Sequence, residues 1–589
     1  MHIVLARQAS GVVQAVRRPE GAGSDPDDAS PWRLAPGELS AAVHARESVE
    51  PSRWTWVDTN RWYPALLADG VRVERAHDLR LAHRVLRGSR FAHGSDLAGA
   101  PSGPWDALEP TVAGGAVDRA RPEQQADSLF DLGDLDGPTH GARSGRPAQT
   151  DPDPVAELAA QQAAVAGASE PGRLRLLLAA ESAAALAAAE MHHAGLPWRA
   201  DVHDAILTEA LGPRPAPGLR PDRLEALVTE IRAALDAPAS LNPDSHPDLL
   251  RAMEYAGVGA RSLRKGELQR LEHPVIAPLL EYKSLYRLYT ANGWHWLDQW
   301  VRGDRFRTDY VVGGVVTGRW SSTGGGALQL PKGVRGAVRA DPGWVLVVAD
   351  AAQLEPRVLA GMARDEAMAR AGRDGDLYAG IVAGGAVASR EHAKVGMLGA
   401  LYGGTTGVSG QVLPRLRSAF PRSMGLVEEA AATGERGGVV TTWLGRSSPP
   451  PGQAWDDAQS GALGDDPAPD AATLARSSAR AWGRFTRNFV VQGTAAEWAD
   501  CWLASIRRRL WALGTAATDG RAPAPFTDRP HLVFFVHDEV VVHAPAELAD
   551  AVAHEVREAA AEAGRLLFGE FPVAFPLTVA AVPAYDEAK

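Results

Sequence analysis

The chain has 589 residues, of which 45% are hydrophobic and 23% charged, a balance that is ordinary for soluble globular proteins. At about 100–200 residues per domain, this length predicts several domains with ample buried core. The net charge of −11 excludes a globally basic nucleic-acid coat protein, but it leaves room for a local basic cleft. The one cysteine, Cys501, excludes an intrachain disulfide framework and argues against a cysteine-based zinc site. No secretory pattern and no apolar run of about 18 residues is visible, so we expect a cytoplasmic protein without a membrane span.

The first 170 residues alternate short ordered patterns with loop-like stretches. A strand pair is expected over 1–17, and two short helices, 63–68 and 78–86, are expected around a strand at 71–73. Gly, Pro, Asp and Ser dominate the linkers or long loops expected at 21–30 and 94–154.

Helical spacing dominates from 174 to 299. The Ala-rich stretch 180–194 predicts a helix that stops at Gly195. Further helices are predicted over 221–235, 247–255 and 278–300.

From residue 305 the pattern changes to strands that end in acidic residues. One continuous apolar run, 344–349, ends in Asp350, and a second, 531–536, ends in His537-Asp538. A strand pattern resumes at Val540, so 537–539 is expected at a hairpin bend. The stretch 365–510 between these strands is predicted to be helical, with a Pro/Gly/Asp-rich insert at 447–470.

A lone Asp at a strand end more commonly caps a turn or helix, but three further blocks accompany this pair. The segment 317–322 precedes Asp350, the helical pattern 390–403 follows it, and 487–496 precedes Asp538. In the second block Arg390, Lys394, Leu398 and Tyr402 recur at every fourth position and therefore share one helix face. That face suits a nucleoside triphosphate, although an ordinary amphipathic helix with solvated charges would show the same spacing.

In this order the blocks resemble the motifs of the family A (bacterial DNA polymerase I) DNA polymerases, over about 174–589. The family's D-Y-S-Q-I-E-L-R motif stands here as Asp350-Ala-Ala-Gln-Leu-Glu-Pro-Arg357, and V-H-D-E as Val536-His-Asp-Glu539. The resemblance implies an α+β right-hand fold, with an antiparallel palm sheet and helical fingers and thumb, in an actinobacterial-type short form. It predicts a degenerate, RNase H-like 3′–5′ exonuclease domain (1–170), thumb (171–300), palm (301–362 and 487–589) and fingers (363–486).

The implied activity is template-directed addition of deoxynucleotides to a primer 3′-hydroxyl, in replication or repair near the nucleoid. Such transfer uses two divalent ions about 3.5–4 Å apart, here Mg²⁺ with Mn²⁺ as a substitute, on Asp350 and Asp538. Glu539 and Lys394 complete the expected catalytic set. The expected dNTP-binding residues are Arg390, Lys394, Leu398, Tyr402, Gln353, Glu355 and Tyr378. Contacts with primer-template DNA are expected from Arg319, Arg484, Arg487, Asn488, Gln492 and His537.

The sequence departs from the family at several positions. Ala351 and Ala352 replace Tyr-Ser, Leu398 replaces an aromatic residue, Tyr378 replaces a His, and Phe535 replaces a Gln, but no metal ligand is lost. In the N-terminal region no Asp-x-Glu pair stands in the first strands, and no Tyr-x-x-x-Asp motif precedes residue 180. Tyr63 stands where the second Asp is expected, so we predict no proofreading, with Asp58 and Asp78 as surface or capping residues.

Two alternatives remain open at this point. A single-subunit RNA polymerase shares the two carboxylates, but Glu355 stands where the DNA enzymes exclude a 2′-hydroxyl. A non-catalytic DNA-binding relative would not need the retained Asp350, Asp538, Arg390 and Lys394. The stripe formed by Arg476, Arg480, Arg484 and Arg487 fits either a solvated helix face or contacts with a DNA backbone.

Overall fold

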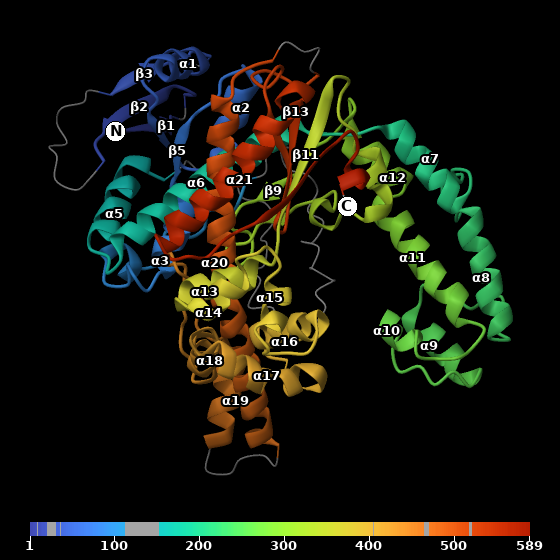
Figure 1. Ribbon diagram of the computed structural model, residues 1–589. Coiled ribbons are helices and arrows are strands. Elements are labelled where there is room, and N and C mark those ends of the chain that lie inside the picture. The colour runs from blue at the N-terminus through green and yellow to red at the C-terminus, as the bar shows by residue number, and fades with distance from the viewer. Residues whose placement is uncertain are drawn as a thin grey trace. The chain divides into compact units, whose positions relative to one another are not determined.

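The computed structural model describes residues 1–8, 10–20, 31–35, 37–111, 152–404, 406–463, 470–516 and 521–588 (Figure 1). It contains two compact units. The first comprises Met1–Gly195, Thr308–Leu328 and Pro342–Ala581, and the second comprises Leu196–Arg307, Gln329–Asp341 and Val582–Lys589. The finer five-part division remains a prediction. No helix in the described ranges is both long and apolar enough for a membrane span.

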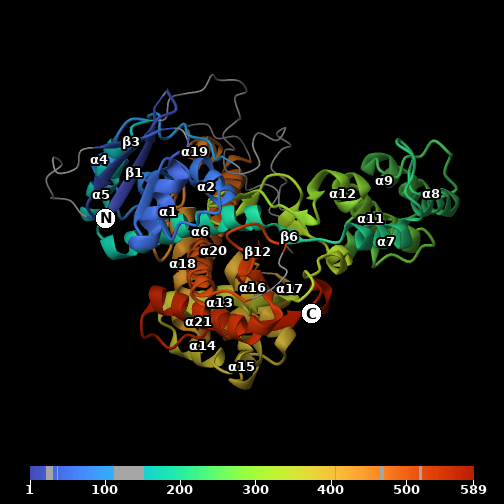
Figure 2. The same cartoon turned by 90° about the horizontal axis from the view of Figure 1, so that it is seen from above.

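A five-stranded sheet opens the first unit, in the order β3-β2-β1-β4-β5. Strands β1 and β3 of this sheet are labelled in Figure 2. Its strands are β1 (His2–Arg7), β2 (Val13–Arg18), β3 (Trp32–Leu34), β4 (Arg53–Trp56) and β5 (Arg75–Asp78). The predicted strand pair is confirmed, because β1 and β2 are antiparallel. The pairs β1–β4 and β4–β5 are parallel, and such pairs require crossover connections, which here contain helices. The helices of this region are α1 (Leu39–Val49), α2 (Thr59–Ala68), α3 (Leu79–Gly88), α4 (Asp96–Gly99) and α5 (Pro154–Ala166).

The predicted helices α2 and α3 are confirmed, but the predicted strand at 71–73 is wrong, since β5 begins at Arg75. The reason lies in the backbone donors of this stretch. The Val71 amide donates to the Leu66 carbonyl, and the Val73 amide donates to the Tyr63 hydroxyl, so neither joins a strand ladder. Both valines are nevertheless buried, which explains their apolar spacing. Of the predicted loops, 21–30 and 112–151 lie outside the described residues.

Two long helices run through the first unit, α6 (Pro171–Ala194) and α20 (Ala471–Ala512), and they pack against each other. The predicted stop of α6 is confirmed: Gly195 has φ 72°, a left-handed conformation that favours glycine. A four-stranded sheet lies in the same unit, in the order β12-β13-β11-β14. Its members are β11 (Trp344–Ala351), β12 (His531–Val536), β13 (Glu539–Pro545) and β14 (Leu577–Val582). Helix α21 (Ala549–Phe568) packs against both α20 and this sheet, and the short pair β9 (Tyr310–Val311) and β10 (Ser321–Ser322) is separate.

Short helices form a second core in the first unit, around Ile381, Met397, Leu416 and Phe489. They are α13 (Leu354–Ala363), α14 (Glu366–Ala371), α15 (Leu377–Ala383), α16 (Arg390–Tyr402), α17 (Gly407–Ala419) and α18 (Pro421–Glu435). The predicted helical character of 365–510 is thereby confirmed. The predicted insert contains a helix of its own, α19 (Gln453–Leu463), while 464–469 lie outside the described residues.

The second unit is mostly helical, as predicted for 174–299 beyond α6. It contains α7 (Ala200–Leu211), α8 (Asp222–Ala234), α9 (His246–Tyr255), α10 (Lys265–Leu268), α11 (Ile276–Asn292) and α12 (Trp294–Trp300). Its small sheet joins β6 (Leu196–Pro197), β8 (Arg305–Phe306) and β7 (Val301–Arg302) in that order. The single helix predicted over 278–300 is wrong at one point: it breaks at Gly293, where a Cβ atom would collide with the Tyr289 carbonyl.

A buried ionic cluster ties the N-terminal region to α6 and α20. Glu190 on α6 accepts hydrogen bonds from Arg507 Nε at 2.8 Å, from Arg507 Nη2 at 2.6 Å and from the Tyr63 hydroxyl at 2.6 Å. Arg507 also donates to the carbonyls of Val73 and Glu74. These side chains are almost fully buried, so each charge depends on its partner.

We expect Glu190→Ala to destabilise the protein by about 3–5 kcal/mol, because it leaves Arg507 buried without its counterion. The midpoint of urea unfolding, followed by tryptophan fluorescence, measures this loss. Glu209→Ala, on the exposed face of α7, is the matched control and should change stability by less than about 0.5 kcal/mol. Equal midpoints for the two variants would show that the cluster does not hold these elements together.

Candidate functional site

Two carboxylates meet at one end of the four-stranded sheet. Strands β11 and β13 pair antiparallel, with Asp350 opposite Glu539. The Ala351 amide donates to the Asp538 carbonyl at 2.9 Å, which fixes the turn beside the end of β11. His537 takes the left-handed conformation at this turn, with φ 56°. The predicted bend at 537–539 is confirmed, and it brings Asp350 and Asp538 together.

The two carboxylates repel each other in this half-buried position. Burial, followed by the negative charge of Asp350, raises the pKa of Asp538 to about 7. A divalent cation would relieve this repulsion, so the donor chemistry fits one. Among the described residues no group of three or more His, Cys, Asp or Glu side chains is arranged to hold a metal. A cation here would therefore need substrate phosphates and water as further ligands, which Mg²⁺ commonly uses.

The predicted stripe lies along α16. Arg390 and Lys394 are exposed, whereas Leu398 and Tyr402 are half-buried. The opposite face packs into the second core through buried residues including Ala393, Met397 and Leu401. The helix therefore presents two cations, then an apolar side chain, then a hydroxyl along one face.

Glu355, at the start of α13, bonds side chains from two other parts of the first unit. Its Oε1 accepts a hydrogen bond from Arg319 Nη2 at 2.5 Å, and its Oε2 accepts one from the Tyr402 hydroxyl at 2.7 Å. Gln492 Nε2 on α20 donates to the Tyr402 oxygen at 3.5 Å. Burial and the charge of Glu355 raise the pKa of Tyr402, which keeps its hydroxyl a donor. Two residues expected to bind dNTP, Glu355 and Tyr402, thus form one hydrogen-bonded chain with two expected to contact DNA, Arg319 and Gln492.

Asp376 is a site residue that the sequence reasoning missed. Its Oδ2 accepts from Arg390 Nε at 2.6 Å, and its Oδ1 accepts from Gln353 Nε2 at 2.9 Å. Tyr378 follows it on α15; burial raises the pKa of Tyr378 to about 12, and its ring lies 5.8 Å from the Arg390 guanidinium carbon. The signal that was available is the Gly375-Asp376 step before a helix, which is typical of an N-cap.

The four arginines predicted as a stripe on α20 differ in their exposure to solvent. Arg476, Arg480 and Arg484 are exposed, and Arg484 also lies against Gly403 at the end of α16. Arg487 is half-buried, and its Nη1 donates to the Ala400 carbonyl at 3.0 Å. Arg487 thus ties α20 to α16. The predicted DNA contacts of Arg484, Arg487, Asn488 and His537 remain predictions.

A buried polar cluster lies under the hairpin that carries Arg319. Arg446 pairs with Glu181 and fills the space beside Gly318, where a Cβ atom would lie 2.5 Å from Arg446 Nε. Trp320 Nε1 donates to Asp500 at 3.0 Å, and burial raises the pKa of Asp500 to about 7. Only glycine fits at position 318, directly before Arg319, because a Cβ atom would collide with Arg446 and because the backbone φ of 89° is positive.

Phe535, one of the departures noted in the sequence, is a core residue. It is 5% exposed, and its ring centroid lies 5.0 Å from that of Trp320. Its backbone also exchanges hydrogen bonds with the Tyr310 hydroxyl. Phe535 thus holds the β9–β10 hairpin against β12.

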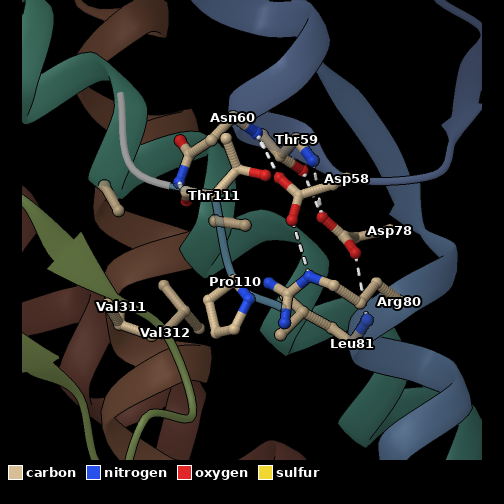
Figure 3. Close-up of a pocket in the computed structure, with 12 residues that line it drawn as sticks. Asp58, Thr59, Asn60, Asp78, Arg80, Leu81, Pro110, Thr111, Val311 and Val312 are labelled. Atoms are coloured by element: carbon tan, nitrogen blue, oxygen red, sulfur yellow. Dashed lines mark hydrogen bonds and ion pairs between the residues drawn. The ribbon is translucent and has the colours of Figure 1, made fainter. Parts of the chain in front are cut away.

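The N-terminal carboxylates line a small pocket with both polar and apolar walls (Figure 3). Asp58 caps α2 and Asp78 caps α3, which confirms the predicted capping. The alternative of a surface position is wrong for both, since each is only 1% exposed. Their buried carboxylates have partners: Arg80 Nε pairs with Asp58 at 2.6 Å, and Thr59 donates to Asp78. The enclosed space is about 10 Å³, near the minimum for one water molecule.

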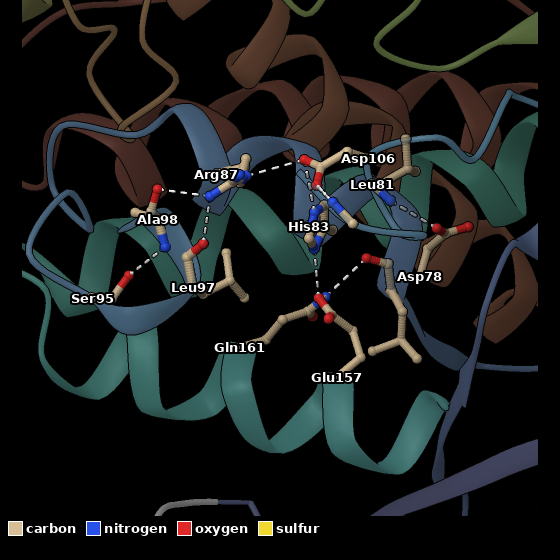
Figure 4. A network of polar contacts seen from close by, with 12 residues as sticks. Asp78, Leu81, His83, Arg87, Ser95, Leu97, Ala98, Asp106, Glu157 and Gln161 are labelled. Atoms are coloured by element: carbon tan, nitrogen blue, oxygen red, sulfur yellow. Dashed lines mark hydrogen bonds and ion pairs between the residues drawn. The ribbon is translucent and has the colours of Figure 1, made fainter. Parts of the chain in front are cut away.

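A second polar network adjoins this pocket (Figure 4). His83 bonds Glu157 at 2.8 Å and Asp106 at 3.3 Å, and these bonds raise its pKa although burial opposes the charge. Beside it, Val4, Leu79 and Leu158 form an apolar cluster on the sheet. In this network His83, Glu157, Asp106, His77 and Gln161 bond one another.

About half of the chain is similar in sequence to known DNA polymerases. The profile described as "DNA polymerase family A" matches residues 248–582, more than half of the chain. The protein "DNA polymerase I, thermostable" of Thermus filiformis is 29% identical over 336 residues, covering 51% of this chain and 36% of that protein. "DNA polymerase I" of Chloroflexus aurantiacus is 27% identical over 323 residues, covering 50% and 30%. The chain thus spans about a third of the length of these relatives.

A solved structure is similar in fold over the whole chain. It is described as "POL domain of Pol1 from M. smegmatis complex with DNA primer-template and dNTP". The TM-score is 0.63 at 16% identity, with 100% of this chain and 95% of that chain covered. The predicted α+β fold of the polymerase type is thereby confirmed.

We expect Asp538→Asn to stabilise the metal-free protein near pH 8 and to have little effect near pH 4. The pKa of Asp538 is raised in the folded state, so its ionisation penalises folding increasingly as the pH rises from about 4 through 7. At about 1.4 kcal/mol per pKa unit, the upper limit of the gain is about 4 kcal/mol.

Urea unfolding in EDTA at the two pH values measures this difference. Asp374→Asn removes an exposed carboxylate of the same unit and is the control. A gain for Asp538→Asn that is equal at both pH values would contradict the electrostatic explanation.

Proposed function

Because the chain belongs to DNA polymerase family A, we propose that it is a template-directed DNA polymerase that adds deoxynucleotides to a primer 3′-hydroxyl. The observation that carries the proposal is the sheet-end pair Asp350 and Asp538 in the unit that also presents the cationic face of α16. Glu355 joins the two parts, since α13 follows β11 directly and Glu355 bonds Tyr402 of α16. A mere DNA-binding relative would not need both parts.

In this proposal α16 holds the incoming nucleotide. Arg390 and Lys394 bind its phosphates through charge-assisted contacts, while Leu398 and Tyr402 contact the base and sugar. Glu355 lies below the sugar and excludes a 2′-hydroxyl. Gln353 and Tyr378 complete the nucleotide-binding set through their contacts around Asp376 and Arg390.

The metal ligands in this proposal are Asp350 and Asp538, with Mg²⁺ as the cation and Mn²⁺ as a substitute. When bound, divalent cations supply Lewis-acid stabilisation of the charge that develops on the attacking and leaving oxygens. The chain's own part is to hold both carboxylates at the strand ends, with Glu539 buried beside them. Lys394 adds a positive charge for the departing pyrophosphate.

Arg319, Gln492, Arg484, Arg487, Asn488 and His537 are proposed to contact primer-template DNA. We also propose the division into thumb, palm and fingers that the sequence predicts. Helix α20 runs unbroken across the expected border between fingers and palm at 486 and 487. We further propose that region 1–170 does not proofread. The ion-paired Asp58 and the apolar cluster around Val4 and Leu158 support this.

We expect Asp350→Ala and Asp538→Ala to lower primer extension by several orders of magnitude while primer-template binding persists, because either change removes a ligand of the charge-stabilising cations.

Extension with separate dNTP and rNTP pools measures activity and sugar preference, and a mismatched 3′-labelled primer without nucleotides measures proofreading. Asp550→Ala, an exposed carboxylate on α21, is the control. Robust extension by either strand-end variant would refute the assignment, and extension from rNTPs alone would favour an RNA polymerase.

We expect Glu355→Ala to raise the use of ribonucleotides relative to deoxynucleotides roughly tenfold or more, because it opens the space below the sugar. The ratio of kcat/KM for the two nucleotides measures this change. Glu355→Gln is the matched control, since it keeps the side-chain volume and should keep most of the exclusion. A ratio that stays unchanged in Glu355→Ala would place the selection elsewhere.

A further inference from the structure

Arg390, which the proposed function assigns to a nucleotide phosphate, already holds an anion of this chain. Its Nε donates to Asp376 Oδ2 at 2.6 Å. We propose that Asp376 is a built-in competitor for the triphosphate, which occupies the Arg390 guanidinium until a nucleotide displaces it. This inference rests on the proposed function and adds to it a residue that sets how much nucleotide the site requires.

Asp376 is held rigidly in place. Its Oδ1 accepts from the backbone amides of Tyr378 at 3.0 Å and Ala379 at 3.2 Å, as the N-cap of α15. Gln353 Nε2 donates to the same oxygen, and the Gln353 side chain in turn accepts from the Leu377 amide at 2.9 Å and from Arg357. Arg357 is buried, with four backbone carbonyls as further acceptors. The carboxylate thus belongs to the fixed part of the site.

Arg390 is the partner that is free to move. Its side chain is 56% exposed, and among the described residues its only hydrogen bond is the one to Asp376. Lys394, one turn further along the same face of α16, makes no ion pair with any described residue. Of the two cations that face the proposed phosphate site, Arg390 is therefore paired with a carboxylate, whereas Lys394 has no ion-pair partner among the described residues.

This arrangement adds the same cost to every anion that binds Arg390. A triphosphate must break the ion pair between Arg390 and Asp376, and so must a pyrophosphate. Exposed ion pairs contribute about 0.2–1 kcal/mol, so the competition corresponds to a change of roughly 1.4- to 5-fold in apparent affinity. Asp376 therefore weakens binding of every anion.

The test is Asp376→Asn in the full chain. Asn caps helices about as well as Asp, so α15 is retained while the charge is lost. Asp374→Asn, an exposed carboxylate two residues earlier, removes the same charge without contacting Arg390. We expect Asp376→Asn to lower KM for dNTP roughly 1.4- to 5-fold with kcat unchanged, and Asp374→Asn to match the wild type. In an Arg390→Ala background the effect of Asp376→Asn should disappear.

A second readout is independent of polymerase activity: calorimetric binding of inorganic tripolyphosphate to the protein without DNA. Tighter binding by Asp376→Asn than by wild type and Asp374→Asn supports the proposal. Unchanged or weaker binding, a raised KM, or an effect that persists with Arg390→Ala overturns it. Failure of the wild type to extend any primer would defeat the proposed function, while the binding experiment would still decide the role of Asp376.

Discussion

The candidate site depends on holding two like charges close together in a half-buried place. Antiparallel pairing of β11 and β13, with the hydrogen bond from the Ala351 amide to the Asp538 carbonyl, forces Asp350 and Asp538 to one end of the sheet. Burial, followed by the charge of Asp350, opposes ionisation of Asp538 and raises its pKa. The apolar interior of β12 and β13 and the packing of α20 and α21 supply the stability that offsets the repulsion.

Several polar groups around this pair are satisfied by other side chains of the site. Glu355 holds Arg319 and Tyr402, and Asp376 holds Arg390. These contacts prevent the cost of unpaired polar groups in the partly buried parts of the site. A substrate that takes the place of any one partner must break the corresponding contact, so these side chains compete with the substrate for the same groups.

The sequence predicted the elements whose signals are local. The apolar runs before Asp350 and His537, the helical spacing of α16 and the stop at Gly195 all appear in the structure as expected. The misses depend on backbone contacts that side-chain patterns do not show. Val71 and Val73 looked like a strand, but their amides bond to the end of α2 and to Tyr63. The helix expected over 278–300 breaks at Gly293, whose backbone is extended and brings its Cα so near the Tyr289 carbonyl that only glycine fits.

The same distinction holds within the candidate site. Spacing placed Arg390 and Tyr402 on one face, but it could not reveal that Asp376 bonds Arg390 from another helix. Spacing also could not show that Arg487 donates a hydrogen bond within the protein, because its acceptor is the backbone carbonyl of Ala400, which side-chain patterns do not reveal. The burial of Asp58 and Asp78 likewise depends on Arg80, whose guanidinium reaches Asp58 only in the folded chain.

The buried cluster around Glu190 has a consequence for how this gene can change. Arg507 of α20 takes two of its acceptors from the backbone of residues 73 and 74, and Glu190 takes one donor from Tyr63. A deletion of the N-terminal region would therefore leave a charged pair of the remaining protein facing solvent on one side, with its hydrogen bonds missing. Loss of this region by a single deletion would therefore carry a stability cost at Glu190 and Arg507, whereas point substitutions elsewhere in the region would not. The buried cluster in this way favours keeping the region in the chain.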